Sequence, residues 1–146
     1  MQISTKFTIA IHLLAAVEYF GKTEKVTSAF LAGSIGCHPV IVRNIMLALQ
    51  SAGLIEVKRG TGGIRINRPL KEITFLDVYQ AVETGSDKNL FNFHENPNPK
   101  CPVGSHIHDA LDGQLHEIQE RFEEELGRHS VGDVYLIIDK EAAGTK

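Results

Sequence analysis

Basic residues flank a run of glycines near the middle of the chain, and this arrangement could bind phosphate. The stretch KRGTGGIRI covers residues 58–66, with Lys58 and Arg59 before the glycines and Arg65 after them. A nucleotide-binding phosphate loop would continue with Lys and Ser or Thr at the start of a helix. Here Ile-Arg-Ile follows Gly63, which suits a β-strand instead. We therefore expect a glycine-tipped β-hairpin whose cationic arms could contact the backbone or the narrow minor groove of DNA.

A second group of reactive side chains lies further along, where one cysteine is accompanied by histidines. Cys101 precedes Pro102 at the expected start of a long helix, and a helix N-terminus lowers the pKa of a nearby thiol. Such a thiolate could sense oxidants or electrophiles through a sulfenic acid, a mixed disulfide or a disulfide between two subunits. A buried structural cysteine is an equal alternative.

The same region could be interpreted as a metal site, because the imidazoles of His94, His106 and His108 and the Cys101 thiolate suit zinc, copper or iron. However, no standard spacing of paired ligands is present, and His106 and His108 do not share a helix face. The sequence therefore predicts no metal site. Cys37, at the start of another expected helix, is interpreted as a packing residue, although its oxidation could disturb that helix.

Three helices are expected in the first part of the chain, over residues 4–20, 27–34 and 39–52. Ser4 or Thr5 could cap the first of these helices. Its apolar spacing predicts a buried face made of Ala10, Leu13, Leu14, Val17 and Phe20.

The second and third helices are joined by a tight turn that contains glycine. Thr27 or Ser28 would cap the second helix, and Pro39 would open the third, where proline is tolerated. The predicted buried face of the third helix consists of Ile41, Ile45, Ala48, Leu49 and Ala52. Two short helices joined in this way indicate a helix-turn-helix. With strands expected over residues 54–57 and 64–67, the pattern predicts a winged helix.

A winged helix would place the N-terminal end of its third helix in the major groove of DNA. Arg43 could pair with guanine or a phosphate, Asn44 could reach an adenine edge or a phosphate, and Val40 could touch a thymine methyl. Taken singly, each could also be an ordinary surface residue. The full set of predicted DNA contacts is Thr27, Ser28, His38, Pro39, Val40, Arg43, Asn44, Lys58, Arg59, Gly60, Thr61, Gly62 and Arg65.

The second half of the chain is expected to hold a fourth helix over residues 74–84, a loop over 85–103 and a long helix over 104–127. Thr74 and Asp77 are spaced as in a capping box. Beyond the long helix, a short helix and a strand are both open alternatives for the final apolar segment, residues 131–138.

An apolar stripe follows the long helix with a 4-4-3-4-4 spacing, through Ile107, Leu111, Leu115, Ile118, Phe122 and Leu126. Such a stripe is long for a small monomer to cover, so we expect a homodimer. The predicted interface consists of Ile107, Leu111, Leu115, Ile118 and Phe122. Packing of the stripe on the protein's own first helix is the alternative. The expected fold is mainly α with a small β-hairpin: a winged helix-turn-helix domain plus a long dimerisation helix.

The net charge of −3 over 146 residues is unevenly distributed. Residues 1–69 hold eight Lys and Arg against three Asp and Glu, whereas residues 70–146 hold seven against fifteen. The basic half can bind a polyanion, whereas the acidic half would be repelled by one. We therefore expect a DNA-binding domain over residues 1–70, followed by a linker helix, a sensor loop and a dimerisation helix over residues 71–146.

The location expected from the composition is the cytoplasm. No apolar run approaches the roughly 20 residues of a membrane span, and the N-terminus lacks the zones of a signal peptide. Two cysteines argue against a disulfide framework. We expect no contact with a membrane.

Three motifs occur in order along the chain: Ala52-Gly53-Leu54-Ile55, then Arg59-Gly60-Thr61-Gly62-Gly63, then Ile73-Thr74-Phe75-Leu76-Asp77-Val78 with Ala81-Val82-Glu83. In these motifs the chain resembles, over nearly its whole length, the Rrf-two family of bacterial transcription regulators. The resemblance implies a winged-helix homodimer joined through the long C-terminal helix, which binds palindromic operators as a repressor or occasionally an activator. It also implies DNA contacts at Arg59, at its neighbours and at the start of the third helix.

The resemblance bears on the cofactor as well. Cluster-binding members of that family carry three cysteines before the long helix, whereas this chain has only Cys101 between residues 85 and 108. Iron–sulfur clusters usually need about four ligands, mostly thiolates, so we expect no cofactor. The expected function is sequence-specific regulation of transcription by a repressing homodimer that could respond to redox state through Cys101, and not catalysis. A winged-helix protein-interaction module and a metal-responsive regulator are the alternatives.

Overall fold

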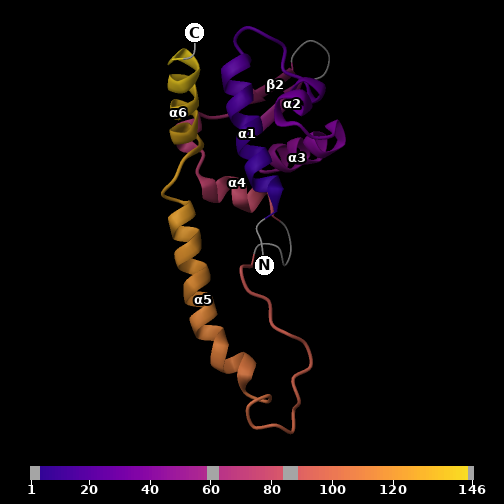
Figure 1. Ribbon diagram of the computed structural model, residues 1–146, viewed down its shortest axis with the longest axis vertical. Coiled ribbons are helices and arrows are strands. Elements are labelled where there is room, and N and C mark those ends of the chain that lie inside the picture. The colour runs from indigo at the N-terminus through magenta and orange to yellow at the C-terminus, as the bar shows by residue number, and fades with distance from the viewer. Residues whose placement is uncertain (1–3, 59–62, 84–88, 145–146) are drawn as a thin grey trace.

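The computed structural model describes residues 4–58, 63–83 and 89–144, and these are mainly helical around one short hairpin. The elements are α1 (Thr5–Phe20), α2 (Ser28–Ile35), α3 (Pro39–Ser51), β1 (Ile55–Lys58), β2 (Gly63–Ile66), the 3-10 helix η1 (Leu70–Glu72), α4 (Phe75–Val82), α5 (Ile107–Leu126) and α6 (Val131–Gly144). The first four helices, the hairpin and α6 form a body from which α5 projects (Figure 1). The predicted class, a winged helix-turn-helix followed by a long helix, is confirmed.

Helix α1 runs through the body and contacts α2, α3, α4, α6 and β2. Its predicted face is confirmed, because Ala10, Leu13, Leu14 and Val17 are buried and Phe20 is half-buried. Burial of this face against so many neighbours explains why the helix forms in spite of its β-branched residues.

A buried carboxylate lies at the N-terminus of α1. Ser4 occupies the N-cap position, but its hydroxyl does not cap the helix and donates instead to Oε1 of Glu83 over 2.7 Å. Glu83, the residue after α4, is only 2% exposed. This hydrogen bond joins the start of α1 to the end of α4.

The buried face of α3 differs from the predicted one. Ile41 is exposed, Ala48 is half-buried, and Ala52 is exposed beyond the end of the helix. The side chains that α3 buries are Val42, Ile45, Met46 and Leu49. Apolar residues occupy nearly every position from 40 to 49 except Arg43 and Asn44, so several faces had similar hydrophobicity. Packing against α1 and α4 selects one of them.

The predicted capping box at the start of α4 is confirmed. The Asp77 N–H donates to Oγ1 of Thr74 over 3.0 Å, and the Thr74 N–H donates to the Asp77 carboxylate over 2.9 Å. Arg68 adds an ion pair with the same carboxylate, also at 2.9 Å. The cap therefore joins the segment after the hairpin to α4.

Helix α5 begins at Ile107, three residues later than predicted. The preceding residues form turns that close on the carbonyl of Pro102, which accepts from the Ser105 hydroxyl at 3.3 Å and lies 2.7 Å from Nδ1 of His106. At Gly104 the chain approaches Asn98 so closely that an added Cβ would lie 2.7 Å from its carbonyl oxygen. These local contacts compete with helix formation.

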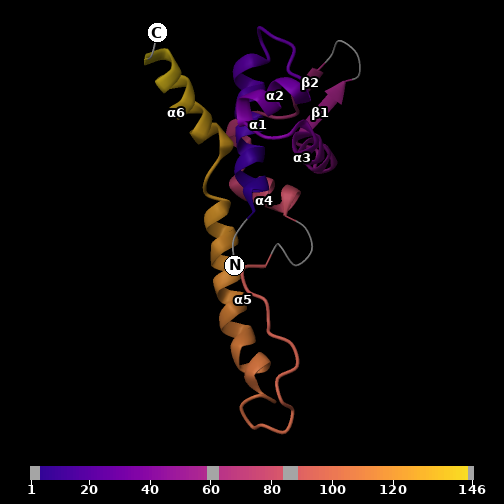
Figure 2. The same cartoon turned by 45° about the vertical axis from the view of Figure 1, so that its right-hand side comes forward.

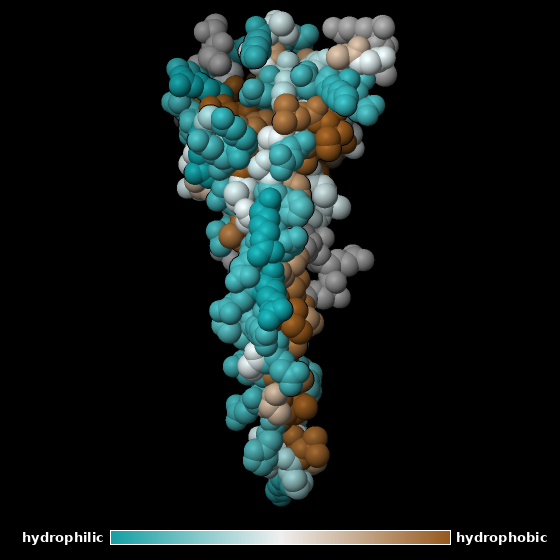
Figure 3. Space-filling view, turned by 90° about the vertical axis from the view of Figure 1, so that its left-hand side faces the viewer, coloured by the Kyte–Doolittle hydropathy of each residue, from teal (hydrophilic) through white to brown (hydrophobic). Residues whose placement is uncertain are grey.

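The apolar stripe of α5 is not buried within the chain, since no α5 side chain is fully buried. Of the predicted interface residues, Ile118 is 47% exposed, and Ile107, Leu111, Leu115 and Phe122 are half-buried. Within the chain α5 contacts α4, where the rings of Phe122 and Tyr79 meet edge to face at 5.6 Å. Hydrophobic surface accordingly runs along the projecting shaft in Figure 3.

Of the two alternatives for residues 131–138, helix is correct, and α6 continues to Gly144. Its start is docked by backbone contacts. Thr74 and Ser130 form an isolated antiparallel bridge, and the Val131 N–H donates to the carbonyl of Ile73 over 2.8 Å. Gly132, also buried, lies against η1. From this anchor α6 leans away from the body towards its C-terminal end (Figure 2).

Within the described ranges, no single helix is long and apolar enough to cross a membrane, although α2 and α3 meet the length and composition criteria as a bent pair.

Candidate nucleic-acid interface

Helices α2 and α3 are separated by only three residues and meet at a sharp angle. The chain bends by 111° between them, within the range of about 90–120° that helix-turn-helix motifs show. Gly36 ends α2 with a φ of +82°, a conformation that side chains with a Cβ rarely adopt. The turn therefore sends α3 across the body with its N-terminal end at the surface.

Each of these two helices is capped by a residue predicted to contact DNA. Oγ1 of Thr27 accepts from the Phe30 N–H, and Nδ1 of His38 accepts from the Val40 N–H, both over 3.1 Å. The Thr27 cap was expected, whereas the His38 cap was not. Because Nδ1 accepts, the neutral His38 ring carries its proton on Nε2. Both exposed side chains therefore still hold a hydrogen that can be donated outward.

The outer face of α3 presents the predicted reading residues. Val40, Arg43 and Asn44 are exposed, and Pro39 is half-buried at the first position of the helix. Ile41 and Leu47 are exposed as well, although the sequence interpretation placed Ile41 in the core. This face combines a cation, an amide and apolar groups at the end of a helix.

The hairpin is present in the predicted order, and its register fixes the positions of the basic residues. Lys58 lies opposite Gly63, and Arg65 lies opposite Glu56. Both cations are exposed. The remaining predicted contacts of the wing, Arg59, Gly60, Thr61 and Gly62, lie outside the described residues.

A further basic residue beside the hairpin was not among the predicted contacts. Gly63 has a φ of +65°, and a Cβ added there would lie 3.2 Å from the carbonyl oxygen of Val26 and 3.6 Å from Cγ of Lys25. Lys25, which is exposed, therefore lies next to the start of β2, at the residue that pairs with Lys58 of β1. No local sequence signal identifies it, because Lys25 and Gly63 are brought together by the tertiary fold.

The recognition elements share one side of the body. In both ribbon views α3 and the hairpin lie on the side away from α6 and α5 (Figures 1 and 2). Ser28, at the half-buried first position of α2, belongs to the same helix-turn-helix. The fold thus brings together the described members of the predicted contact set, and all of them come from the basic part of the chain.

Cys101 is half-buried and lies in the turns before α5. The N–H groups of Gly104 and then Val103 hydrogen-bond to its sulfur and lower the pKa of the thiol. The lowered pKa was expected, but its expected cause was wrong, because Cys101 does not lie at a helix start. The other cysteine, Cys37, packs half-buried against the core beside α3, as its interpretation as a packing residue implies.

The histidines near Cys101 make contacts with each other and with the backbone. Nε2 of His108 lies 2.9 Å from the carbonyl oxygen of His94, and the two rings meet edge to face at 5.3 Å. Nδ1 of His106 instead lies within hydrogen-bond distance of the carbonyl oxygen of Pro102. In the part of the chain that the structure describes, no group of three or more His, Cys, Asp or Glu side chains is arranged to hold a metal ion.

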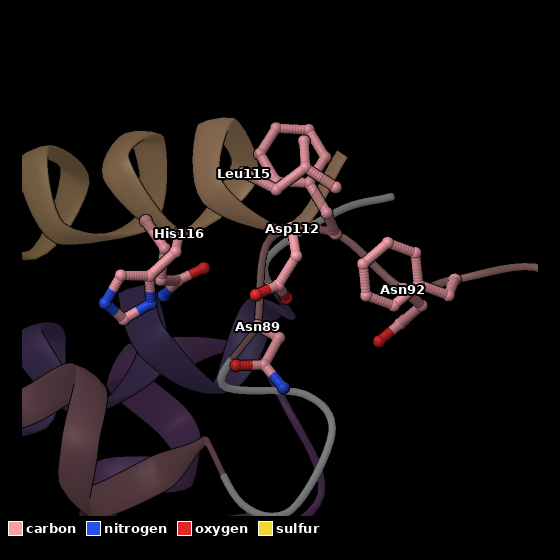
Figure 4. Close-up of a pocket in the computed structure, with 8 residues that line it drawn as sticks. Asn89, Asn92, Asp112, Leu115 and His116 are labelled. Carbon is pink, nitrogen blue, oxygen red and sulfur yellow. The ribbon is translucent and has the colours of Figure 1, made fainter. Parts of the chain in front are cut away.

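A groove of about 270 Å³ lies between the segment after residue 88 and α5. Figure 4 shows Asp112 of α5 pointing towards Asn89 of that segment, with His116 alongside. The segment is held on α5 because the Leu90 N–H donates to Oε1 of Gln119 over 2.8 Å.

Gln119 also connects this segment to the body. It hydrogen-bonds to the hydroxyl of Tyr79, whose pKa is raised mainly by burial. Tyr79 lies in α4, which packs against both α1 and α3. A continuous set of contacts therefore runs from the segment before α5, through Gln119 and Tyr79, to the helix-turn-helix.

Comparisons of sequence agree on one class of protein. The Rrf2 (Rrf-two) family model, described as that of an iron-dependent transcriptional regulator, matches residues 3–136. YwnA of Bacillus subtilis (strain 168), classed as an HTH-type transcriptional regulator, is 36% identical over 132 residues, which are 90% of this chain and 96% of YwnA.

Solved structures share the fold of this chain. The crystal structure of a protein classed as DNA-binding matches with a TM-score of 0.70 and 31% identity, covering 88% of this chain and 97% of its own. CymR, the global cysteine regulator of B. subtilis, matches with a TM-score of 0.66 and 17% identity, covering 92% of this chain and 96% of CymR. T. potens IscR has the same TM-score at 18% identity, covering 98% and 90%. The last two show the fold alone.

Proposed function

The chain belongs to the Rrf2 family of transcriptional regulators, and from this premise we propose that it binds double-stranded DNA as a homodimer and represses transcription. Its relatives are regulators and not enzymes. The observation that carries the proposal is the exposed first part of α3. Arg43 and Asn44 are exposed on α3, and α3 lies on the same side of the body as the hairpin (Figure 1).

In this proposal the N-terminal end of α3 enters the major groove. Arg43 pairs with guanine or a phosphate, and Asn44 pairs with an adenine edge or a phosphate. The outward hydrogens of Thr27 and His38 reach phosphates on either side of the groove. Because each of these two residues also caps a helix, its donor is held in a fixed position.

The wing contacts the adjoining DNA backbone or minor groove. Lys58 and Arg65 are exposed on its two strands, and Lys25 adds a third cation beside it. Arg59 and the glycines that follow it are assigned to the same contact on the family resemblance. Cations here neutralise phosphates and release counterions, which favours binding without reading sequence.

Two copies would pair through α5. The stripe of Ile107, Leu111, Leu115, Ile118 and Phe122 has no buried member, so it retains apolar surface that a second copy can cover. Leu136 and Ile137 on α6 are also exposed and extend the available apolar surface. Pairing would place two reading helices on a two-fold axis, which suits a palindromic operator.

We further propose that this member acts without an iron–sulfur cluster, despite the iron dependence in the family description. The chain has two cysteines. Cys37 packs against the core of the helix-turn-helix, whereas Cys101 lies in the turns before α5. One thiolate in that segment does not fit the usual donor set of about four, mostly cysteine, ligands.

A thiol response through Cys101 is the signal that the site supports best. Its lowered pKa raises the thiolate fraction, and the thiolate is the nucleophile. Peroxide would transfer one oxygen to the thiolate, giving a sulfenic acid and releasing hydroxide. The change would reach α3 through the contacts of Leu90, Gln119 and Tyr79.

The test of DNA binding is fluorescence anisotropy with labelled duplexes over a series of salt concentrations. For each phosphate contact, the logarithm of affinity should fall with the logarithm of salt by a slope of about 0.9. Arg43→Ala should weaken binding to a selected operator by roughly tenfold if the arginine reads a base, and should lower the salt slope by about one if it grips a phosphate.

Arg121→Ala is the matched control, because Arg121 is an exposed cation on α5, paired with Glu117 at 3.0 Å. It should leave both quantities unchanged. Absence of binding to any duplex at low salt would contradict the proposal and favour a protein-interaction module. Loss of the peroxide response in Cys101→Ser, with operator binding retained, would support the thiol signal, and survival of the response would exclude it.

A further inference from the structure

The reading helix, α3, exposes three large apolar side chains. Val40 is 45% exposed, Ile41 is 43% exposed and Leu47 is 61% exposed. None of these three belongs to the face that α3 buries. Scattered exposed apolar residues are common, but two of these are adjacent at the start of the reading helix and form one small patch.

The partner follows from where the patch lies. Val40 and Ile41 occupy the first turn of α3, immediately after the His38 cap and Pro39. On a helix, residues three or four apart are neighbours, so Val40 adjoins Arg43 and Asn44, and Ile41 adjoins Asn44. The apolar patch therefore shares the surface of the two polar residues assigned to the major groove, and the flanking charge is cationic.

The major-groove edge of DNA offers one apolar group, the C5-methyl of thymine. We infer that Val40 and Ile41 read thymine methyls, and that each operator half-site carries thymines at neighbouring positions beside the base pair contacted by Asn44. The inference rests on the proposed DNA-binding function and extends it to the chemistry of the operator. Ile41 becomes a specificity-determining residue, a role opposite to the core position that its sequence context indicates.

Leu47 supplies an internal control for apolar exposure. It is at least as exposed as the other two, but it lies two turns further along, about 10 Å from Val40 at 1.5 Å per residue. The end of the helix that enters the groove is the N-terminal one. Leu47 is therefore outside the methyl-reading patch.

The experiment starts from operators selected out of random duplexes by the purified full-length protein. Thymines in the conserved positions of each half-site are then replaced one at a time by deoxyuridine, which removes the methyl and keeps base pairing. Wild-type affinity should fall about fourfold for each contacted thymine, the effect of exposing one methylene-sized group. Replacement at uncontacted thymines should change nothing.

The variants Val40→Ala, Ile41→Ala and Leu47→Ala assign each methyl to a side chain. All three positions are exposed, so the variants should fold. In Ile41→Ala, replacement of one thymine by deoxyuridine should no longer weaken binding, whereas replacement of the neighbouring thymine should still do so. Val40→Ala should show the reverse. Each protein variant and each base replacement together form a double-mutant cycle, which isolates the contact between side chain and methyl. Leu47→Ala should retain both effects.

Three results would overturn the inference while leaving the DNA-binding function intact: selected half-sites without neighbouring thymines, wild-type affinity that is insensitive to uracil, or uracil effects that persist in both first-turn variants. If no sequence is enriched and no salt-dependent binding occurs, the proposed function itself is wrong and the inference fails with it.

Discussion

Substitution of Gly132 by alanine should detach α6 from the body, because the backbones of α6 and η1 are in contact there. A Cβ built on Gly132 lies 2.6 Å from both the nitrogen and Cα of Lys71 and 3.0 Å from the carbonyl carbon of Leu70. All three are backbone atoms, which cannot rotate aside as a side chain would. The neighbouring Val131 is fully buried, and its N–H donates to the carbonyl of Ile73. Helix α6 therefore cannot shift without breaking this hydrogen bond.

The magnitude follows from the cost of overpacking. Forcing an extra carbon into a filled contact costs about 1–3 kcal/mol. For a chain of this size, each kcal/mol lowers the melting temperature by about 2–4 °C. The expected decrease is therefore about 2–12 °C. Alanine stabilises a helix by up to about 1 kcal/mol relative to glycine. A lower melting temperature in Gly132→Ala would therefore show that the clash costs more than this gain.

Gly113→Ala is the matched control, on the neighbouring helix. A Cβ at Gly113, in the interior of α5, meets nothing within 4 Å. This variant should gain about 0.5–1 kcal/mol from helix propensity alone. Thermal unfolding followed by circular dichroism, at one fixed protein concentration, gives both values. If Gly132→Ala is as stable as Gly113→Ala, the close contact between α6 and η1 does not exist in solution.

Three further outcomes are expected. Thr74→Ala removes the acceptor of the capping box and should cost about 1 kcal/mol in urea unfolding, and an unchanged midpoint would contradict the cap. Alkylation of Cys101 should reach half its maximal rate at a lower pH in the folded protein than in urea. The reason is that backbone N–H groups lower the pKa of the thiol in the folded protein, so the thiolate forms at lower pH. Identical pH profiles in the two states would exclude a lowered pKa. Leu111→Asp with Ile118→Asp should give monomers by light scattering, whereas Gly113→Asp, at an exposed position on the opposite face of α5, should not. A dimer that survives the double substitution would place the interface elsewhere.

Elements with strong local signals were predictable. Helix starts are marked by side chains that cap them or by a proline that fits the first turn. The structure has the expected residues at these positions: Thr27 caps α2, Pro39 begins α3, and Thr74 with Asp77 forms the capping box of α4. The hairpin also followed from local pattern, because the glycines separate two β-prone arms. Such features depend on a few adjacent residues, so the sequence contains the information that determines them.

Features that depend on distant packing were not predictable. The face of α3 that turns inward, and hence the exposure of Ile41, is chosen by α1 and α4 among several apolar faces. The bond between Ser4 and Glu83 joins residues 79 positions apart. Likewise, Lys25 comes to lie beside Gly63 only through the tertiary fold. At Pro102 the local signal was itself ambiguous, because a proline can open either a helix or a turn.

The bridge between Thr74 and Ser130 has a consequence for the spacing of the operator. It fastens the junction of α5 and α6 to the start of α4, main chain to main chain, and α4 packs on α3. In a pair of chains joined along α5, the separation and angular phase of the two reading helices would then be set by rigid connections within each copy. One base pair inserted between half-sites rotates one of them by about 34° and moves it by about 3.4 Å. Such a protein should tolerate base changes at the centre of its operator far better than changes in the length of that centre.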